Sequence, residues 1–268
     1  NGIIGLLKIA EKHFDDSELV LENFGKMQVA ADYLLSLIND ILQMSKIEDG
    51  NVPLTQEIIN FDELSQDVLT IIEQRAKDRG IQMQFRSKKE GLRYPFIYGS
   101  PVHMRQIFLN IYGNCIKYNR IGGKIITVSG YTEAVDGITT YEWTITDTGI
   151  GMSKEYQEHI FDPFSQERED ARSTQQGIGL GMAIVKGLIE KMGGTIEVKS
   201  EEGIGSTFII RIPFKLAPAP DTGKKTAAQM DISGLNLLLV EDNELNTEIA
   251  ETLLSDEGAN LTVAEDGL

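Results

Sequence analysis

The feature that most constrains the fold is an apolar pattern with a seven-residue period within residues 17–49. Two interleaved rows form this pattern, which we call the heptad seam: Phe24, Ala31, Ile38 and Ser45, and Met27, Leu34, Ile41 and Glu48. The period predicts one long helix with an apolar face of the coiled-coil or four-helix-bundle type. Because a lone helical hairpin cannot bury such a face, we expect a second copy of the chain to cover it.

The residues before this long helix predict another helix. Residues 1–13 are rich in Ile, Leu and Ala, and a short turn follows in which Asp16 or Ser17 is expected to be the N-cap. Pro53 prevents the long helix from continuing. We therefore predict that residues 1–52 form a helical hairpin, half of a four-helix bundle, that lacks its first part.

The middle of the chain, residues 53–215, combines helical and strand patterns. Residues 140–146 alternate with a period of two, as a half-buried strand does. The patterns predict helices at 62–79, 101–118 and 180–192, and strands at 81–86, 124–133, 138–147, 195–200 and 206–214. Helices segregated beside a mostly antiparallel sheet indicate the α+β class.

The end of the chain predicts a linker and a fragment of a further domain. Residues 216–233 are rich in Pro, Ala and polar residues, which is typical of a linker. Within residues 234–268, the continuous apolar run 235–240 predicts a buried parallel strand, and a helix at 243–256 and a strand at 260–263 follow. We expect this segment to be the truncated start of an α/β domain.

The overall composition excludes several classes of protein. The net charge of −16 repels phosphate backbones, so a nucleic-acid partner is not expected. A single cysteine, Cys115, excludes an internal disulfide and suits a reducing compartment. No apolar run reaches the roughly 20 residues that a membrane helix needs, and no signal peptide opens the chain. We expect a cytoplasmic location without membrane contact, which leaves open a membrane anchor upstream of residue 1.

A first candidate site lies in residues 106–118. Asn110, Asn114 and Lys117 are four and three residues apart, so they share one face of the predicted helix. An amide oxygen can ligate Mg²⁺, and a Lys can neutralise a phosphate. Two asparagines on a helix are by themselves more often surface residues, so this segment alone leaves both interpretations open.

A second candidate site is the sequence Asp-Thr-Gly-Ile-Gly-Met at residues 147–152, at the end of a predicted strand. The Asp147 carboxylate can accept a hydrogen bond from an exocyclic amine such as that of adenine. Gly149 and Gly151 allow the backbone to approach a ligand closely. An ordinary Asp/Gly turn would explain the same residues.

Two further glycine clusters follow. Residues 177–185 open a helix, so their free N–H groups and the positive end of the helix dipole can face a phosphate. This cluster is neither a Walker loop, because no Gly-Lys-Ser/Thr follows, nor a Rossmann start, because no strand directly precedes it. Residues 203–208 form a glycine turn that leads into a strand, for which a simple hairpin is the alternative.

A polar stretch separates the second motif from the third. Residues 161–166 read Phe-Asp-Pro-Phe-Ser-Gln, and residues 167–176 then lack apolar anchors. Such a stretch predicts a mobile lid. Arg172 within it could reach a terminal phosphate.

Taken together, the order and spacing of these motifs resemble those of sensor histidine kinases, specifically the hybrid type. The segments that resemble the family's N, G1, F, G2 and G3 boxes are 106–118, 147–152, 161–166, 177–182 and 205–208. Residues 37–48 resemble the end of the family's dimerisation hairpin, and residues 240–246 resemble the opening of a receiver domain. The resemblance thus covers nearly the whole chain.

The resemblance implies a Bergerat-type ATP-binding fold, an α/β sandwich, in residues 53–215, with ATP and Mg²⁺ as ligands. It implies that Asn114 ligates Mg²⁺ beside Asn110, that Lys117 meets phosphates and that Asp147 reads the adenine amino group. The nucleotide-binding residues that it implies are Asn110, Asn114, Lys117, Tyr118, Asp147, Gly149, Gly151, Phe164, Arg172, Gly177, Gly179, Leu180, Gly181 and Thr207. Glu241 and Asp242 match the acidic pair that helps a receiver domain to bind Mg²⁺.

For the parent protein, the resemblance implies autophosphorylation of a histidine just upstream of residue 1 and relay to an aspartate beyond residue 268. We expect no phosphoacceptor within the chain, because His13, His103 and His159 lie in other contexts. The chain also departs from the family's pattern at two positions. Ile178 stands where Thr is usual, which removes a hydroxyl near the phosphates, and Cys115 stands where Ala is usual and is expected to be a packed residue.

Three functions remain to be compared. The first is the ATP-binding and dimerisation region of a two-component kinase, a homodimer that acts on a receiver domain or a downstream phosphotransfer protein. The second is an ATP hydrolase like the gyrase and chaperone relatives, which use a Glu as general base where Asn110 stands. An amide cannot take a proton from water, so hydrolysis should be poor. The third is a degenerate kinase that serves as a dimeric scaffold, and a nucleotide-binding measurement distinguishes it from the first.

Overall fold

The computed structural model describes residues 2–88, 93–167, 179–219 and 233–264. The chain divides into two compact units, residues 1–219 and residues 220–268.

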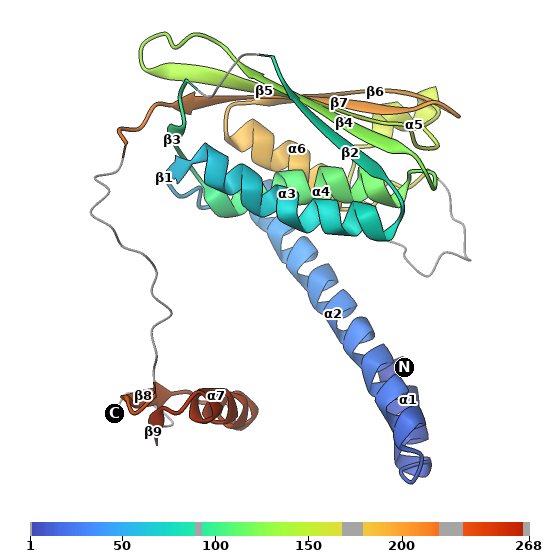
Figure 1. Ribbon diagram of the computed structural model, residues 1–268, viewed down its shortest axis with the longest axis vertical. Coiled ribbons are helices and arrows are strands. Elements are labelled where there is room, and N and C mark those ends of the chain that lie inside the picture. The colour runs from blue at the N-terminus through green and yellow to red at the C-terminus, as the bar shows by residue number, and fades with distance from the viewer. Residues whose placement is uncertain (1, 89–92, 168–178, 220–232, 265–268) are drawn as a thin grey trace. The chain divides into compact units, whose positions relative to one another are not determined.

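The first unit opens with two helices, α1 (Gly2–Lys12) and α2 (Ser17–Glu48), which lie side by side (Figure 1). Asp16 is the N-cap of α2, because its Oδ1 accepts a hydrogen bond from the Leu19 N–H at 3.1 Å. Ala10 of α1 and Asn23 of α2 are buried where the two helices pack.

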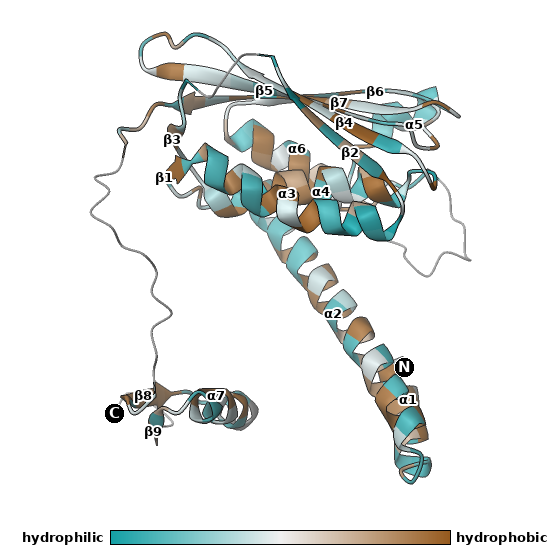
Figure 2. Cartoon of the chain, in the orientation of Figure 1, coloured by the Kyte–Doolittle hydropathy of each residue, from teal (hydrophilic) through white to brown (hydrophobic). Residues whose placement is uncertain are grey.

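Much of the heptad seam remains exposed. Phe24 and Ile38, for example, remain 50% and 53% exposed. Figure 2 shows apolar residues recurring along α2 as far as the end that carries α1. The chain by itself therefore leaves this apolar face in contact with solvent.

The middle of the chain forms a two-layer sandwich (Figure 1). Its sheet has the strand order β2-β4-β5-β7-β6, in which β2 runs parallel to β4 and every other neighbouring pair is antiparallel. The bounds are β2 (Gln82–Ser87), β4 (Lys124–Tyr131), β5 (Ile138–Asp147), β6 (Thr195–Glu201) and β7 (Gly205–Lys215). The mostly antiparallel sheet that the sequence predicted is therefore confirmed for these strands.

Three helices cover one face of this sheet (Figure 1). They are α3 (Phe61–Asp78), α4 (Pro101–Lys117) and α6 (Gly181–Lys191), each within one or two residues of its predicted bounds. A short antiparallel pair, β1 (Glu57–Asn60) with β3 (Phe96–Gly99), and the helix α5 (Lys154–His159) were not predicted. These three elements are only 4 to 6 residues long, too short for a periodic pattern.

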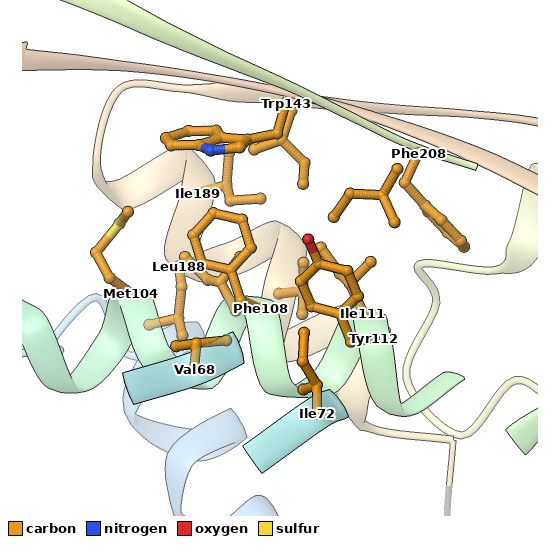
Figure 3. Close-up of a cluster of buried hydrophobic side chains, with 14 of the residues drawn as sticks. Val68, Ile72, Met104, Phe108, Ile111, Tyr112, Trp143, Leu188, Ile189 and Phe208 are labelled. Carbon is orange, nitrogen blue, oxygen red and sulfur yellow. The ribbon is translucent and has the colours of Figure 1, made fainter. Parts of the chain in front are cut away.

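The core lies between the helices and the sheet (Figure 3). Alternate residues of β5 point into it, so Tyr141, Trp143 and Ile145 are buried. Trp143 lies edge-on to Phe108 of α4, with ring centroids 5.1 Å apart. Around them pack Val68, Ile72, Met104, Ile111, Tyr112, Leu188, Ile189 and Phe208.

The last turns of α2 contact the sandwich. Ile47 packs against Gly187 of α6, where an added Cβ would lie 2.5 Å from the Ile47 Cγ2. The Gln43 side chain of α2 donates to the Gln106 Oε1 of α4 at 2.6 Å. Helix α2 thus meets the sandwich through an apolar contact with α6 and a pair of amides with α4.

The second unit contains β8 (Asn236–Val240), α7 (Glu244–Asp256) and β9 (Asn260–Ala264). The predicted parallel pairing is confirmed, since β8 pairs with β9 in parallel. The prediction that this strand is buried is wrong: Leu238 is 66% exposed. A two-stranded sheet with one helix cannot cover both of its faces.

None of the helices in the described parts of the chain combines the length and apolar character that crossing a membrane requires.

Candidate functional site

The predicted site residues of α4 meet the start of α6. Asn110 Nδ2 donates to the Gly181 carbonyl at 3.5 Å, a long hydrogen bond. Asn110 and Asn114 lie one helical turn apart and are both partly buried. The structure therefore brings Asn110 to the N-terminus of α6, although Asn110 and Gly181 are 71 residues apart in sequence.

Asp147 lies at the last position of β5, with only 6% of its surface exposed. Its Oδ1 accepts hydrogen bonds from the backbone N–H groups of Gly149, at 2.8 Å, and Ser206, at 3.3 Å. Burial raises the pKa of this carboxyl above its ordinary value, while these donors act in the opposite direction. Two donors on the same oxygen fix the plane of the carboxylate.

Cys115 lies beside this carboxylate on α4. Its side chain is buried and hydrogen-bonds Asp147, and burial raises the pKa of the thiol well above its ordinary value. The expectation that this cysteine is a packed residue is confirmed. Its contact with the predicted adenine-reading residue is a finding that the sequence did not predict.

The two glycines of the second motif have packing reasons of their own. A Cβ on Gly151, whose φ is +69°, would overlap the Glu201 carbonyl oxygen, and one on Gly149 would overlap the Tyr118 carbonyl. Protein backbone lies where these side chains would be, so the two glycines allow segments of the chain to pack closely. Close approach of a ligand to them stays a prediction.

Lys117 and Tyr118 end α4 next to the same loop. The Tyr118 carbonyl accepts a hydrogen bond from the Ile150 N–H at 3.0 Å. The centroid of the Tyr118 ring lies 4.9 Å from the Lys117 Nζ. The tyrosine side chain is about half exposed, so it lies at the rim rather than in the core.

Other predicted site residues lie beside the start of α6. Leu180 is buried in the core at the start of α6, and Gly179 packs its backbone against Phe164 and Ser165. Phe164 has a φ of +64° and is mostly exposed. Arg172, Gly177 and Ile178, and residues 168–176 of the predicted lid, lie outside the described residues.

Thr207 lies beside the end of β5. Its Oγ1 lies 3.1 Å from the Thr146 Oγ1, on the face of the sheet opposite to the core-facing Phe208. The neighbouring Ser206 is the residue that contacts Asp147. This contact is made by the backbone N–H of Ser206, which the alternation of side chains along a strand does not report.

The predicted acidic pair of the second unit shows only local contacts. Glu241 Oε1 accepts from the Asn246 Nδ2 at 2.9 Å and from the Asn243 N–H at 3.3 Å. Asp242 is exposed. Within the described residues, no group of three or more His, Cys, Asp or Glu side chains could hold a metal ion.

Two of the three histidines contact residues that are close to them in sequence, and the third lies in a turn. His103 Nδ1 lies 2.7 Å from the Ser100 Oγ at the start of α4, and His159 Nδ1 lies 2.7 Å from the Asp162 carboxylate. His13 lies in the turn that joins α1 to α2.

Comparisons with known proteins agree with this geometry. The family of histidine kinase-, DNA gyrase B- and HSP90-like ATPases matches residues 99–216. Sensor histidine kinase AruS of Pseudomonas aeruginosa is 31% identical over 271 residues, which cover 99% of this chain and 26% of that protein. Sensor protein GacS of Pseudomonas syringae pv. syringae is 33% identical over 269 residues, which cover 98% of this chain and 28% of that protein.

This chain is also similar to a solved structure of full-length ShkA in complex with AMPPNP, with a TM-score of 0.60 and 26% identity. The matched region covers 91% of this chain and 48% of the ShkA chain. The chain spans about a quarter to a third of the length of the curated relatives that it matches. The sandwich, the buried strand-end carboxylate and the matched residues lead to one conclusion. Residues 99–216, which match the family of histidine kinase-, DNA gyrase B- and HSP90-like ATPases, lie in a mixed helix and sheet fold similar to that of a histidine kinase.

Proposed function

We propose that this chain is the ATP-binding and dimerisation region of a hybrid sensor histidine kinase. In the whole protein, the γ-phosphoryl group of ATP would pass to a histidine and then to a receiver aspartate. The observation that carries the proposal is the buried Asp147 carboxylate, held by two backbone donors at the end of β5. The similarity of the chain to AruS and GacS along nearly its whole length supports the proposal.

Asp147 would recognise adenine. A carboxylate offers only acceptors when ionised, and the exocyclic amine of adenine offers donors. Guanine carries a carbonyl at the corresponding position, which a fixed carboxylate would repel. Because Asp147 is almost fully buried, a mismatched base would place an acceptor against its carboxylate where a donor is needed, and discrimination should be strong.

Asn114 and Asn110 would hold the phosphates and their Mg²⁺, with Lys117 nearby. Amide oxygens are suitable ligands for this hard cation, which usually retains several waters. The bound ion would neutralise charge on the phosphates. The N-terminus of α6 at Gly181, next to Asn110, supplies free N–H groups and the positive end of a helix dipole toward an anion.

The domain plan is part of the proposal. Residues 1–52 would form the dimerisation hairpin, 53–215 the ATP-binding domain, 216–233 a linker and 234–268 the start of a receiver domain in which Glu241 and Asp242 help to bind Mg²⁺. The exposed apolar face of α2 supports a second copy of the chain as the partner. A receiver or phosphotransfer protein would be the other partner, and the compartment would be the cytoplasm.

Calorimetric titration with Mg²⁺–ATP and Mg²⁺–ADP tests the site. We expect Asp147→Asn to weaken both nucleotides at least tenfold, because the amide presents a donor to the adenine amine. Asn114→Ala should weaken binding in Mg²⁺ and much less in EDTA. The matched surface controls are Asp67→Asn and Asn51→Ala, both at exposed positions. Unchanged affinity in both site variants would refute the assignment.

Phosphotransfer is tested in the whole protein with γ-labelled ATP. The label should reach a histidine other than His13, His103 and His159, and Asn114→Ala should prevent it. Hydrolysis to free phosphate should be slow, because the amide of Asn110 stands where a general base would be needed and donates to the Gly181 carbonyl. Acid-labile phosphate on one of the three named histidines would contradict the proposal.

A further inference from the structure

The side-chain amide of Gln157 in α5 lies within hydrogen-bond distance of four backbone groups. Its Nε2 lies 3.2 Å from the Met152 carbonyl, 3.2 Å from the Ser153 carbonyl and 3.0 Å from the Ser200 carbonyl. Its Oε1 accepts from the Ser200 N–H at 2.9 Å. A single side chain therefore ties the loop that follows Asp147 to strand β6, which lies 43 residues further along the chain.

The Ser200 hydroxyl continues this connection. Its Oγ accepts from the Met152 N–H at 2.9 Å, donates to the Gly205 carbonyl at 2.9 Å and lies 2.9 Å from the Ser206 Oγ. The same hydroxyl thus contacts the loop before α5 and the first two residues of β7. We call Gln157 and Ser200 together the clamp.

The clamp surrounds the segment that holds the Asp147 carboxylate. Ser206, whose hydroxyl contacts Ser200, donates its backbone N–H to the Asp147 Oδ1. On the other side of the turn, the Gly203 N–H donates to the Ile150 carbonyl at 2.7 Å. Residues 149–152 and 203–206 are therefore held together from both sides, and the carboxylate lies where they meet.

We propose that Gln157 and Ser200 are positioning residues for recognition of the adenine base, an inference that rests on the proposed ATP-binding function. They do not reach the base themselves. They hold the loop and the β6–β7 turn in register, and this register orients the Asp147 carboxylate through the Gly149 and Ser206 N–H groups. A carboxylate free to rotate would distinguish the donor of adenine from the carbonyl of guanine less well.

The experiment compares ADP with GDP by calorimetry in the full chain. Ser200→Ala removes the hydroxyl and should weaken ADP about three- to tenfold, which corresponds to about one lost hydrogen bond. GDP affinity should change much less, so the ratio of ADP to GDP affinity should fall. Ser200→Thr restores a hydroxyl and should restore the ratio, which loss of general stability would not explain.

A second pair of variants tests Gln157 independently. Gln157→Glu keeps an acceptor for the Ser200 N–H but places a carboxylate against three carbonyl oxygens, so the ratio should fall as in Ser200→Ala. The control is Gln74→Glu on α3, where the amide is exposed and donates to the exposed Asp78. If a Gln157 variant does not fold, the Ser200 pair decides the question.

The outcomes separate the two proposals. If the unmodified chain binds ADP but both clamp variants keep its ratio of ADP to GDP affinity, the positioning role is wrong and the ATP-binding function stands. The inference is also overturned if ADP and GDP weaken equally in Ser200→Ala. If the unmodified chain binds neither nucleotide, the proposed function itself fails.

Discussion

The sandwich and the helical pair α1–α2 use apolar residues in opposite ways. In the sandwich, residues such as Ile111, Trp143 and Leu188 are buried among neighbours from the same chain. In α2, Phe24 and Ile38 are about half exposed although they belong to a regular apolar seam. The sandwich has covered its apolar surface by itself, whereas the helical pair has not.

This difference shows how the stability of each region should depend on its surroundings. A core closed within one chain gives a stability that is independent of protein concentration. An apolar face left for a second copy gives a stability that rises with concentration, because association is coupled to folding. The four predictions below test this distinction, from the largest expected effect to the smallest.

The largest effect should come from removing a ring in the core of the sandwich. Phe108→Ala deletes the partner of Trp143 and should lower the free energy of unfolding by about 3–5 kcal/mol. Trp143 is the single tryptophan of the chain, so its fluorescence in a denaturant titration reports this region alone. Phe24→Ala in the exposed seam is the control and should leave that transition in place. A similar loss in both variants would break the comparison.

A charged side chain placed in the exposed seam should weaken the association of two copies of the chain. Ile38→Asp should weaken association of two copies by about 2 kcal/mol or more, roughly thirtyfold, because it places a carboxylate in the apolar face. Sedimentation over a concentration series measures this change. Asn39→Asp adds the same charge at the next, off-seam position of α2 and should have little effect. A wild-type chain that stays monomeric throughout would argue against the paired seam.

A buried polar side chain, that of Asn23, lies in the packing between α1 and α2 and can be removed by mutation. Asn23 is 3% exposed, and within the described residues its Nδ2 has no hydrogen-bond partner. Asn23→Ala should therefore raise the stability of the helical pair by about 1–2 kcal/mol, since an unpaired buried amide is unfavourable. Circular dichroism melting at low concentration measures this rise.

The matched control for this change is Asn39→Ala on the exposed face of the same helix. It gains the same helix propensity without relieving a buried amide. The two variants would melt alike if Asn23 already has a partner, for example in a second copy of the chain.

The smallest effect should come from the ion pairs on the outer face of the sheet. The hydrogen bond from Lys88, together with Arg211 at 2.6 Å, lowers the pKa of Glu142 below its ordinary value. The stabilisation is then present above the ordinary carboxyl pKa and is lost as pH falls through the lowered one. Glu142→Gln should remove at most about 1 kcal/mol at pH 7.

Denaturant titrations of this variant and the wild type at pH 7 and near pH 2 measure the change. The two proteins should differ at pH 7 and converge in acid, because the wild-type carboxyl is then protonated. A difference that persists unchanged in acid would show that the effect is packing rather than charge.

Much of the sandwich could be predicted because its patterns are local. The period-two alternation of β5 and the helical periods of α3, α4 and α6 appear within each segment, so their bounds agree with the structure to within one or two residues. The order of the Asn and Gly motifs also indicated the ATP-binding domain. The sequence by itself therefore determined the main elements and the class of site, since each depends on residues that are near one another in the chain.

The tertiary structure decided which atoms meet. The sequence named Thr207 but not Ser206, whose backbone N–H donates to the Asp147 Oδ1. A Cβ on Gly151 would overlap the Glu201 carbonyl oxygen, a contact between segments that the sequence did not predict. Gln157 carried no signal, because its importance comes from partners on another strand, and no periodicity encodes a contact across such a distance. Burial and hydrogen bonding at this site are properties of segments brought together by folding, so they appeared only in three dimensions.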